Sequence, residues 1–267
     1  MANFGLMSTL EDALQYATNV LGASPAALIT DIDGTISRIV SRPEDAVVSE
    51  RMRESLRQLA TQLALVAVVT AREESVARRM VQVPELTYVG NYGLDGASRP
   101  VLAASELTSI KAGVESALVS LPCASLEEKG ISFAVHYRNC YEAGVREQLL
   151  RLVTPIATAA GARVLEGKQV IEVVPAGLPD KGTAISRLVK ERNANGVVYL
   201  GDDLSDIPVF QMLADRRRKT GLPGLSIAII DGETHPAVAE TADLQLAGVD
   251  VAEEFFASLA GMIGKKE

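Results

Sequence analysis

The sequence predicts an α/β protein with a parallel-sheet core and an inserted α+β domain. Short, nearly all-apolar runs alternate with helical patterns towards both ends of the 267-residue chain. This alternation is typical of a parallel sheet with helices on both faces. The middle of the chain instead shows a helix followed by two strands, and then the same order again, which indicates an α+β unit.

The first predicted element is an amphipathic helix. Ser8 and Glu11 have the spacing of a capping box that opens this helix. The apolar positions at helical spacing are Leu10, Ala13, Leu14, Ala17 and Leu21. Ser49 is expected to cap a second helix, and a third is expected from about Glu73. The predicted buried strands are 26–30, 65–69, 197–200 and 226–230.

The predicted insert has two helices, at about 105–121 and 142–158. Two hairpins follow them, at 125–138 and 163–174, and the second turns at Gly167 and Lys168. The expected domains are therefore a core of residues 1–98 and 177–267 and an insert of residues 99–176.

Composition narrows the function classes. The net charge is −8 and aromatic residues make up 4% of the chain, so no nucleic-acid partner is expected. The basic run 216–219 is interpreted as a solvated helix end. The two cysteines and two histidines do not have the spacing of a zinc site. Whether the two cysteines form a disulfide is not decided by the sequence. No apolar run can span a bilayer and no signal peptide is evident, so we expect a cytoplasmic protein without a membrane partner. The oligomeric state is not predicted.

Acidic residues follow the first predicted strand. Asp31 and Asp33 are two residues apart in the segment Asp-Ile-Asp-Gly-Thr. One carboxylate there can act as a nucleophile while the other transfers a proton. Gly34 permits a tight turn. A polar strand-to-turn junction is the ordinary alternative for such a segment.

Three further elements lie where other predicted strands end or a helix begins. Thr70 could hydrogen-bond a phosphoryl oxygen, and Lys181 at a helix N-terminus could neutralise phosphate charge. Asp202, Asp203 and Asp206 offer the hard oxygen ligands that magnesium takes. For each residue taken alone there is an ordinary alternative: Thr70 as a turn residue, Lys181 as a surface lysine and Asp206 as a helix cap.

The order of these elements resembles the haloacid dehalogenase superfamily of phosphatases, from about residue 26 to the C-terminal region. The resemblance implies a Rossmann-like core with an inserted cap, Mg²⁺ as cofactor and an aspartyl-phosphate intermediate. It implies catalytic roles for Asp31, Asp33, Thr70 and Lys181. It also implies a metal site of Asp31, Asp33, Asp202 and Asp206, in which Asp206 supports the metal shell.

The segments 126–138, 90–94, 171–182 and 201–206 are similar to those of trehalose-6-phosphate phosphatases. This similarity implies a substrate-binding set of Asn91, Glu127, Lys129, His136, Arg138 and Glu172. Alternation places His136 and Arg138 on one strand face and Phe133 and Val135 on the other. A solvated sheet face is the alternative. The chain departs from the family at Tyr92, where His is usual, at Asp95, where Glu is usual, and at Ile207, where an acid is usual.

The implied activity is Mg²⁺-dependent hydrolysis of a small-molecule sugar phosphate, with trehalose 6-phosphate as the expected substrate. Another sugar phosphate, such as sucrose phosphate or a glycosylglycerate phosphate, is one alternative. A phosphomutase and a non-catalytic sugar-phosphate sensor are two more. A dinucleotide-binding domain is disfavoured because no G-x-G-x-x-G follows the first strand.

Overall fold

The structure is a computed structural model that describes residues 8–93 and 104–264. Asp95, Leu94 and the expected boundary near residue 98 lie outside the described residues. The chain forms two compact units: Met1–Asp95 with Pro179–Glu267, and Gly96–Leu178. We call them the core unit and the cap unit and describe each by itself.

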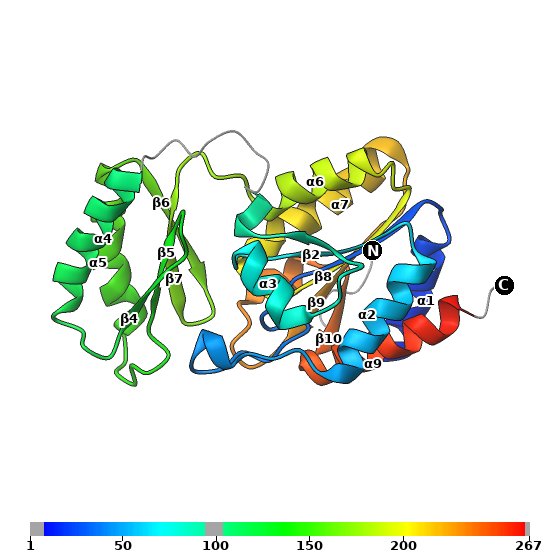
Figure 1. The fold of residues 1–267 in the computed structure, drawn as a ribbon, viewed down its shortest axis with the longest axis horizontal. Coiled ribbons are helices and arrows are strands. Elements are labelled where there is room, and N and C mark those ends of the chain that lie inside the picture. The colour runs from blue at the N-terminus through cyan, green and yellow to red at the C-terminus, as the bar shows by residue number, and fades with distance from the viewer. Residues whose placement is uncertain (1–7, 94–103, 265–267) are drawn as a thin grey trace. The chain divides into compact units, whose positions relative to one another are not determined.

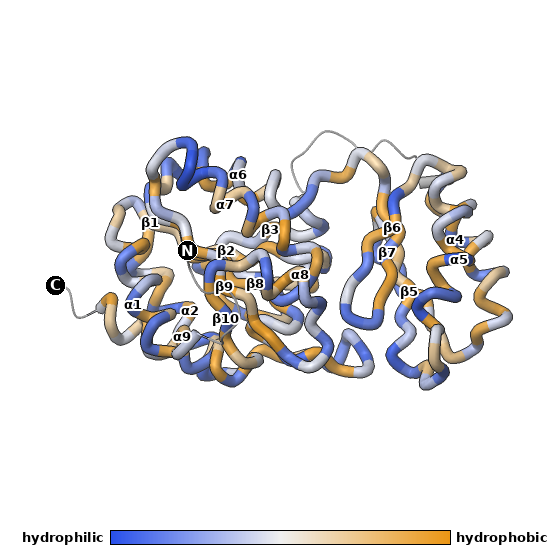
Figure 2. The backbone as a smooth tube through the Cα atoms, turned by 180° about the vertical axis from the view of Figure 1, so that it is seen from behind, coloured by the Kyte–Doolittle hydropathy of each residue, from blue (hydrophilic) through white to orange (hydrophobic). Residues whose placement is uncertain are grey.

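The core unit contains a six-stranded sheet in the order β10-β9-β8-β1-β2-β3, in which all pairs are parallel (Figure 1). This confirms the α/β fold class. The strands are β1 (Ala26–Thr30), β2 (Leu65–Val69), β3 (Thr87–Val89), β8 (Gly196–Gly201), β9 (Gly224–Ile230) and β10 (Leu244–Ala247). All residues of β1, β2 and β8 are buried, as expected for strands covered on both faces. Figure 2 shows hydrophobic stretches along these central strands.

Helices cover both faces of this sheet. The core helices are α1 (Leu10–Leu21), α2 (Glu50–Gln62), α3 (Glu74–Val81), α6 (Lys181–Glu191), α7 (Ile207–Thr220), α8 (Pro236–Thr241) and α9 (Gly248–Ile263). Short 3-10 helices span Pro43–Asp45, Asn91–Gly93 and Leu204–Asp206. One apolar cluster joins the sheet to α1, α2, α3 and α9, and a second joins it to α6, α7 and α8. In the part of the chain that the structure describes, no helix is long and apolar enough to cross a membrane.

The N-terminal helix corrects one sequence prediction. Its capping box is formed by Thr9 and Asp12, not by Ser8 and Glu11. The Asp12 amide donates to Thr9 Oγ1 at 3.0 Å. The helix begins at Leu10, so Thr9 occupies the N-cap position and Asp12 the third helical position, the spacing that a capping box needs. Ser8 instead exchanges hydrogen bonds with the backbone of Gln245 in β10.

The cap unit contains an antiparallel sheet in the order β4-β5-β7-β6 with two helices on one face (Figure 1). Its elements are α4 (Ala104–Leu118), β4 (Ser125–Glu128), β5 (Phe133–His136), α5 (Val145–Ala159), β6 (Ala162–Gly167) and β7 (Val170–Pro175). Phe133, Val135, Ile171 and Val173 pack with both helices in one apolar cluster. A disulfide joins Cys123 to Cys140, the pairing that composition left open.

Candidate active site

The candidate site begins where three neighbouring core strands end. β1 lies between β2 and β8, with Thr30 opposite both Val68 and Leu200. Asp31, Thr70 and Asp202 are the residues that follow these strands, so the register brings them to one edge of the sheet. In open α/β sheets, ligands bind outside the carboxyl ends of the strands at such an edge.

Lys181 connects two of the acidic residues. Its ammonium Nζ lies 2.9 Å from Asp31 Oδ1 and 2.7 Å from Asp206 Oδ1. Lys181 is the first residue of α6, whose N-cap is Asp180. All three side chains of this contact are buried. A lysine held this way lies beside the Asp31 carboxylate without access to bulk water, where charge interactions are strong.

Asp206 accepts four hydrogen bonds. Lys181 and the Tyr199 hydroxyl donate to Oδ1, the latter at 2.6 Å. The backbone amides of Asp202 and Asp203 donate to Oδ2 at 2.8 and 2.9 Å. The side chain of Asp206 makes no capping bond to α7. It does belong to the capping box of the 3-10 helix Leu204–Asp206, through the bond from the Asp203 amide, so the helix-cap alternative holds for that short helix and not for α7.

Two glycines make room for these carboxylates. A Cβ atom on Gly34, whose φ is +84°, would lie 1.9 Å from Asp202 Oδ2. A Cβ atom on Gly201 would lie 2.4 Å from Asp206 Cγ. The glycines of the two motifs therefore serve close packing of the acidic side chains as well as turn geometry.

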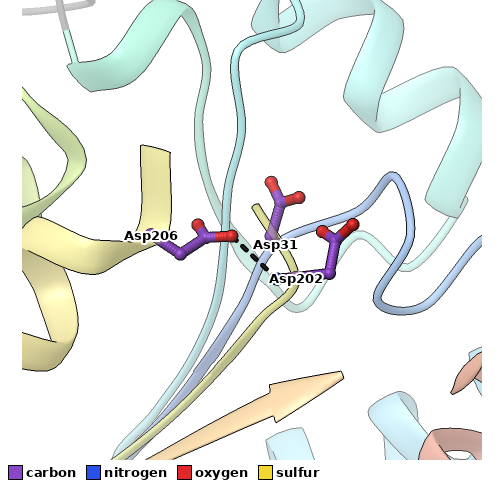
Figure 3. A group of neighbouring side chains, drawn as sticks. All are labelled: Asp31, Asp202 and Asp206. Atoms are coloured by element: carbon purple, nitrogen blue, oxygen red, sulfur yellow. Dashed lines mark hydrogen bonds between the residues drawn. The ribbon is translucent and has the colours of Figure 1, made fainter. Parts of the chain in front are cut away.

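Asp31, Asp202 and Asp206 together have the arrangement of a cation site (Figure 3). They are buried, and one carboxylate oxygen of each lies within 4.8 Å of the others. One buried lysine faces three aspartates, so the ionised cluster keeps a formal excess of two negative charges. Hard oxygen donors with this excess fit a divalent cation such as Mg²⁺. Thr35 Oγ1 orients Asp202 by donating to its Oδ1 at 3.2 Å.

The same electrostatics shift the titration of the cluster. Burial raises the pKa of Asp31 to about 7, with a smaller opposing contribution from Lys181. Burial lowers the pKa of Lys181, but the carboxylates of Asp206 and Asp31 outweigh it and the net pKa is raised, so the ammonium stays charged. Burial and then the charge of Asp206 raise the pKa of Tyr199, which stays protonated and acts as a hydrogen-bond donor.

Asp33 is held separately from this cluster. Arg72 Nε and Nη2 donate to its two carboxylate oxygens at 2.6 and 2.7 Å. Arg72 Nη2 also donates to the carbonyl of Pro43 at 3.1 Å. The Asp33 side chain is one-third exposed, so it is the acidic group of the first motif that solvent reaches. A bidentate pair fixes the orientation of such a carboxylate.

Thr70 and Asn91 occupy neighbouring loops of the core. The Arg72 amide donates to Thr70 Oγ1, and the Asn91 amide donates to the Arg72 carbonyl. The Asn91 Oδ1 atom is buried and accepts no hydrogen bond within the described residues. Tyr92, where the family usually has His, is buried.

The cap unit holds the other predicted substrate residues on the sheet face away from its helices. Glu127 and Glu172 both pair in register with Ala134. His136 Nε2 lies 2.7 Å from Glu127 Oε2, and Ser132 Oγ donates to Glu172 Oε1 at 2.6 Å.

Two basic side chains border this polar face. Lys129 Nζ lies 3.5 Å from Glu172 Oε2. Arg138 lies beyond the end of β5 and donates to the Lys168 carbonyl at 3.3 Å. The structure therefore brings Glu127 together with His136 and Glu172 together with Lys129, while Arg138 binds backbone.

Two residues of the site were missed by the sequence motifs. One is Arg72, which follows Thr70 by two residues and belongs to none of the motifs. Tyr199 lies in a run that was read as nearly all apolar, although a buried phenol usually needs a hydrogen-bond partner. That requirement was the one signal in the sequence that pointed to Tyr199.

Comparisons with known proteins agree with this geometry. Residues 29–249 match the family model described as trehalose-phosphatase. The chain is 33% identical over 220 residues to the trehalose-phosphate phosphatase of Mycobacterium marinum, covering 76% of this chain and 56% of that protein. It is 34% identical over 236 residues to the uncharacterized glycosyl hydrolase Rv2006 of Mycobacterium tuberculosis, covering 81% of this chain but 17% of that protein.

The fold has solved relatives as well. The C-terminal domain of Candida albicans trehalose-6-phosphate phosphatase superposes with a TM-score of 0.80 at 19% identity, covering 97% of this chain and 99% of that one. This likeness extends over both units. The match of residues 29–249 to the family model establishes that the chain belongs to the trehalose-phosphatase family.

Proposed function

We propose that the protein hydrolyses trehalose 6-phosphate to trehalose and phosphate in a Mg²⁺-dependent reaction. The observation that carries the proposal is the buried cluster in which Lys181 bridges Asp31 and Asp206 beside Asp202. A phosphoryl-transfer site needs a positioned nucleophile and fixed positive charge around the transferring group. Family membership supports the choice of sugar phosphate as substrate.

Asp31 is the nucleophile in this proposal. Its carboxylate attacks phosphorus in line, the bond from phosphorus to the sugar oxygen breaks, and an aspartyl-phosphate forms. Asp33 gives its proton to the leaving sugar oxygen. Asp33 then takes a proton from the water that attacks the intermediate, which releases phosphate and restores Asp31. Thr70 and Lys181 bind the phosphoryl oxygens, and Arg72 orients Asp33.

The metal would be held by the Asp31 carboxylate, the Asp33 backbone carbonyl and Asp202, with Asp206 and Asp203 in support. When bound, a divalent cation neutralises phosphate charge and lets two carboxylates share one small site. Ionised Asp31 is the form that attacks. In the metal-free protein this form is disfavoured below pH 7, because burial raises the pKa of the side chain.

The cap unit supplies specificity in this proposal. Glu127, Lys129, His136, Arg138 and Glu172 would bind sugar hydroxyls, with Asn91 contributing from the core. Carboxylates, an imidazole and cations on a sheet face offer both acceptors and donors, which is what a polyhydroxylated ligand requires. The pairs His136–Glu127 and Lys129–Glu172, and the bond from Ser132 to Glu172, hold four of these side chains in place.

The test is phosphate release from a panel of sugar phosphates, with Mg²⁺ and with a chelator. Fast metal-dependent release from trehalose 6-phosphate is expected. Faster release from sucrose phosphate or a glycosylglycerate phosphate would keep the chemistry and change the substrate. Recovery of an isomeric sugar phosphate instead of free phosphate would identify a phosphomutase. Binding without turnover of any ester would identify a sensor and contradict the proposal.

A further inference from the structure

Tyr199 brings a hydroxyl group into a fully buried strand of the sheet. It lies in β8 between Val198 and Leu200, and its side chain is fully buried among apolar neighbours of α7. Its ring centre is 6.0 Å from that of Phe210. The hydroxyl nevertheless reaches the active-site cluster, where it donates to Asp206 Oδ1 at 2.6 Å. A phenylalanine would fill the same space without this bond.

The partner of Tyr199 is a carboxylate with all four acceptor positions in use. Each oxygen of an ionised carboxylate offers about two lone-pair sites. Lys181 and Tyr199 take those of Oδ1, and the amides of Asp202 and Asp203 take those of Oδ2. Direct coordination of a metal by Asp206 would require one of these bonds to break.

We propose that Tyr199 is a positioning residue of the phosphatase reaction that acts through Asp206, and that Asp206 orients Lys181 without binding the metal directly. This inference rests on the proposed function. The hydroxyl of Tyr199 shares Asp206 Oδ1 with Lys181, so the lysine divides its interactions between Asp206 and Asp31. Without the hydroxyl, that oxygen turns to Lys181 alone and draws the ammonium away from Asp31, where the phosphoryl group is transferred.

The chain provides a matched control for the hydroxyl. Tyr88 is also buried in the core unit, and its hydroxyl donates to the Val83 carbonyl at 2.8 Å, away from the cluster. Tyr199→Phe removes one buried phenolic hydrogen bond, and Tyr88→Phe removes two, the one donated to the Val83 carbonyl and one accepted from the Val83 amide at 3.3 Å. Only the first removes a bond to the active-site carboxylates.

The experiment measures kcat and KM of both variants on trehalose 6-phosphate and on p-nitrophenyl phosphate. Tyr199→Phe is expected to lower kcat about tenfold on both esters, the effect of one hydrogen bond to a charged group. KM and the Mg²⁺ affinity measured by calorimetry without substrate are expected to stay unchanged. Tyr88→Phe is expected to keep kcat. Equal kcat values for the two variants, or a loss of Mg²⁺ affinity in Tyr199→Phe, would overturn the inference.

A double-mutant cycle tests the route through Asp206. Asp206→Asn is expected to lower kcat at least as much as Tyr199→Phe, and the double variant no further than Asp206→Asn alone. Additive losses would overturn the inference. Should Asp206→Asn fail to fold, the comparison of the two tyrosine variants decides. A wild type active only on p-nitrophenyl phosphate would refute the proposed substrate and leave the tyrosine test readable. A wild type inactive on every ester would refute both.

Discussion

The charged cluster at the core edge has all its side chains buried, whereas the polar face of the cap combines a buried carboxylate, Glu172, with a partly exposed pair. In the core, Asp31, Lys181, Asp202 and Asp206 are 0–5% exposed and interlocked. In the cap, His136 and Glu127 form a pair whose side chains are 27% and 35% exposed. Buried charges interact strongly with one another, whereas a partly exposed pair can exchange partners with a ligand. This contrast supports the proposal that the core carries out the chemistry and the cap recognises the sugar.

The largest effect is expected from the metal cluster. Asp202→Asn should lower Mg²⁺-dependent turnover about a thousandfold, since it removes a hard anionic ligand. Calorimetry should show weaker Mg²⁺ binding in the same variant. Asp45→Asn is the control, because Asp45 forms an exposed pair with Arg42. Full turnover by Asp202→Asn would mean that the metal binds elsewhere, and would contradict the assignment of the buried core cluster as the metal site.

Within the core, some features could be predicted from the sequence and others could not. The core strands were predictable because continuous apolar runs identify buried parallel strands, and Asp31, Thr70 and Asp202 follow such runs directly. The hydrogen bond between Tyr199 and Asp206 could not be predicted, because it depends on how the segment 201–206 folds. The capping position shifted by one residue because Ser8 and Thr9 are both good caps. Strand β3 is three residues long and carries too short a pattern to detect.

A second prediction concerns pH and the buried nucleophile. The pKa of Asp31 is raised from 3.8 to about 7 on folding. Between these values the folded metal-free protein holds a proton that the unfolded chain has lost, so the free energy of unfolding falls as pH rises through this window. The total loss is on the order of 4 kcal/mol. Urea unfolding in EDTA at pH 5 and pH 8 covers the part of this window above pH 5, so wild type should lose about 3 kcal/mol between the two pH values and Asp31→Asn should lose less, while equal losses would contradict the prediction.

In the cap, stability should depend on the disulfide. Cys123 and Cys140 are 17 residues apart, and closing a loop of this size contributes roughly 3 kcal/mol when the thiols are oxidised. The variant with both cysteines changed to serine should therefore unfold at lower urea concentration than the oxidised wild type. The chain has no tryptophan, so far-UV circular dichroism is the suitable probe. Reduced wild type should match the variant, and identical midpoints for all three samples would refute the prediction.

The smallest effect is expected on the polar face of the cap. Glu127→Gln should lower kcat/KM for trehalose 6-phosphate about tenfold, since a carboxylate accepts stronger hydrogen bonds from sugar hydroxyls than an amide does. Activity on p-nitrophenyl phosphate should not change. The neighbouring Glu128 pairs with Lys111 on α4, so Glu128→Gln is the matched control. Equal effects of the two substitutions would contradict a role of this cap face in substrate recognition.

The most direct test of the central claim is to trap the covalent intermediate. The enzyme is mixed with ³²P-labelled trehalose 6-phosphate and Mg²⁺, quenched in acid within milliseconds, digested and sequenced by mass spectrometry. The account predicts a hydroxylamine-sensitive phosphoryl group on Asp31 in wild type and none in Asp31→Asn. Label on another residue, or rapid phosphate release by Asp31→Asn, would contradict the assignment of Asp31 as nucleophile.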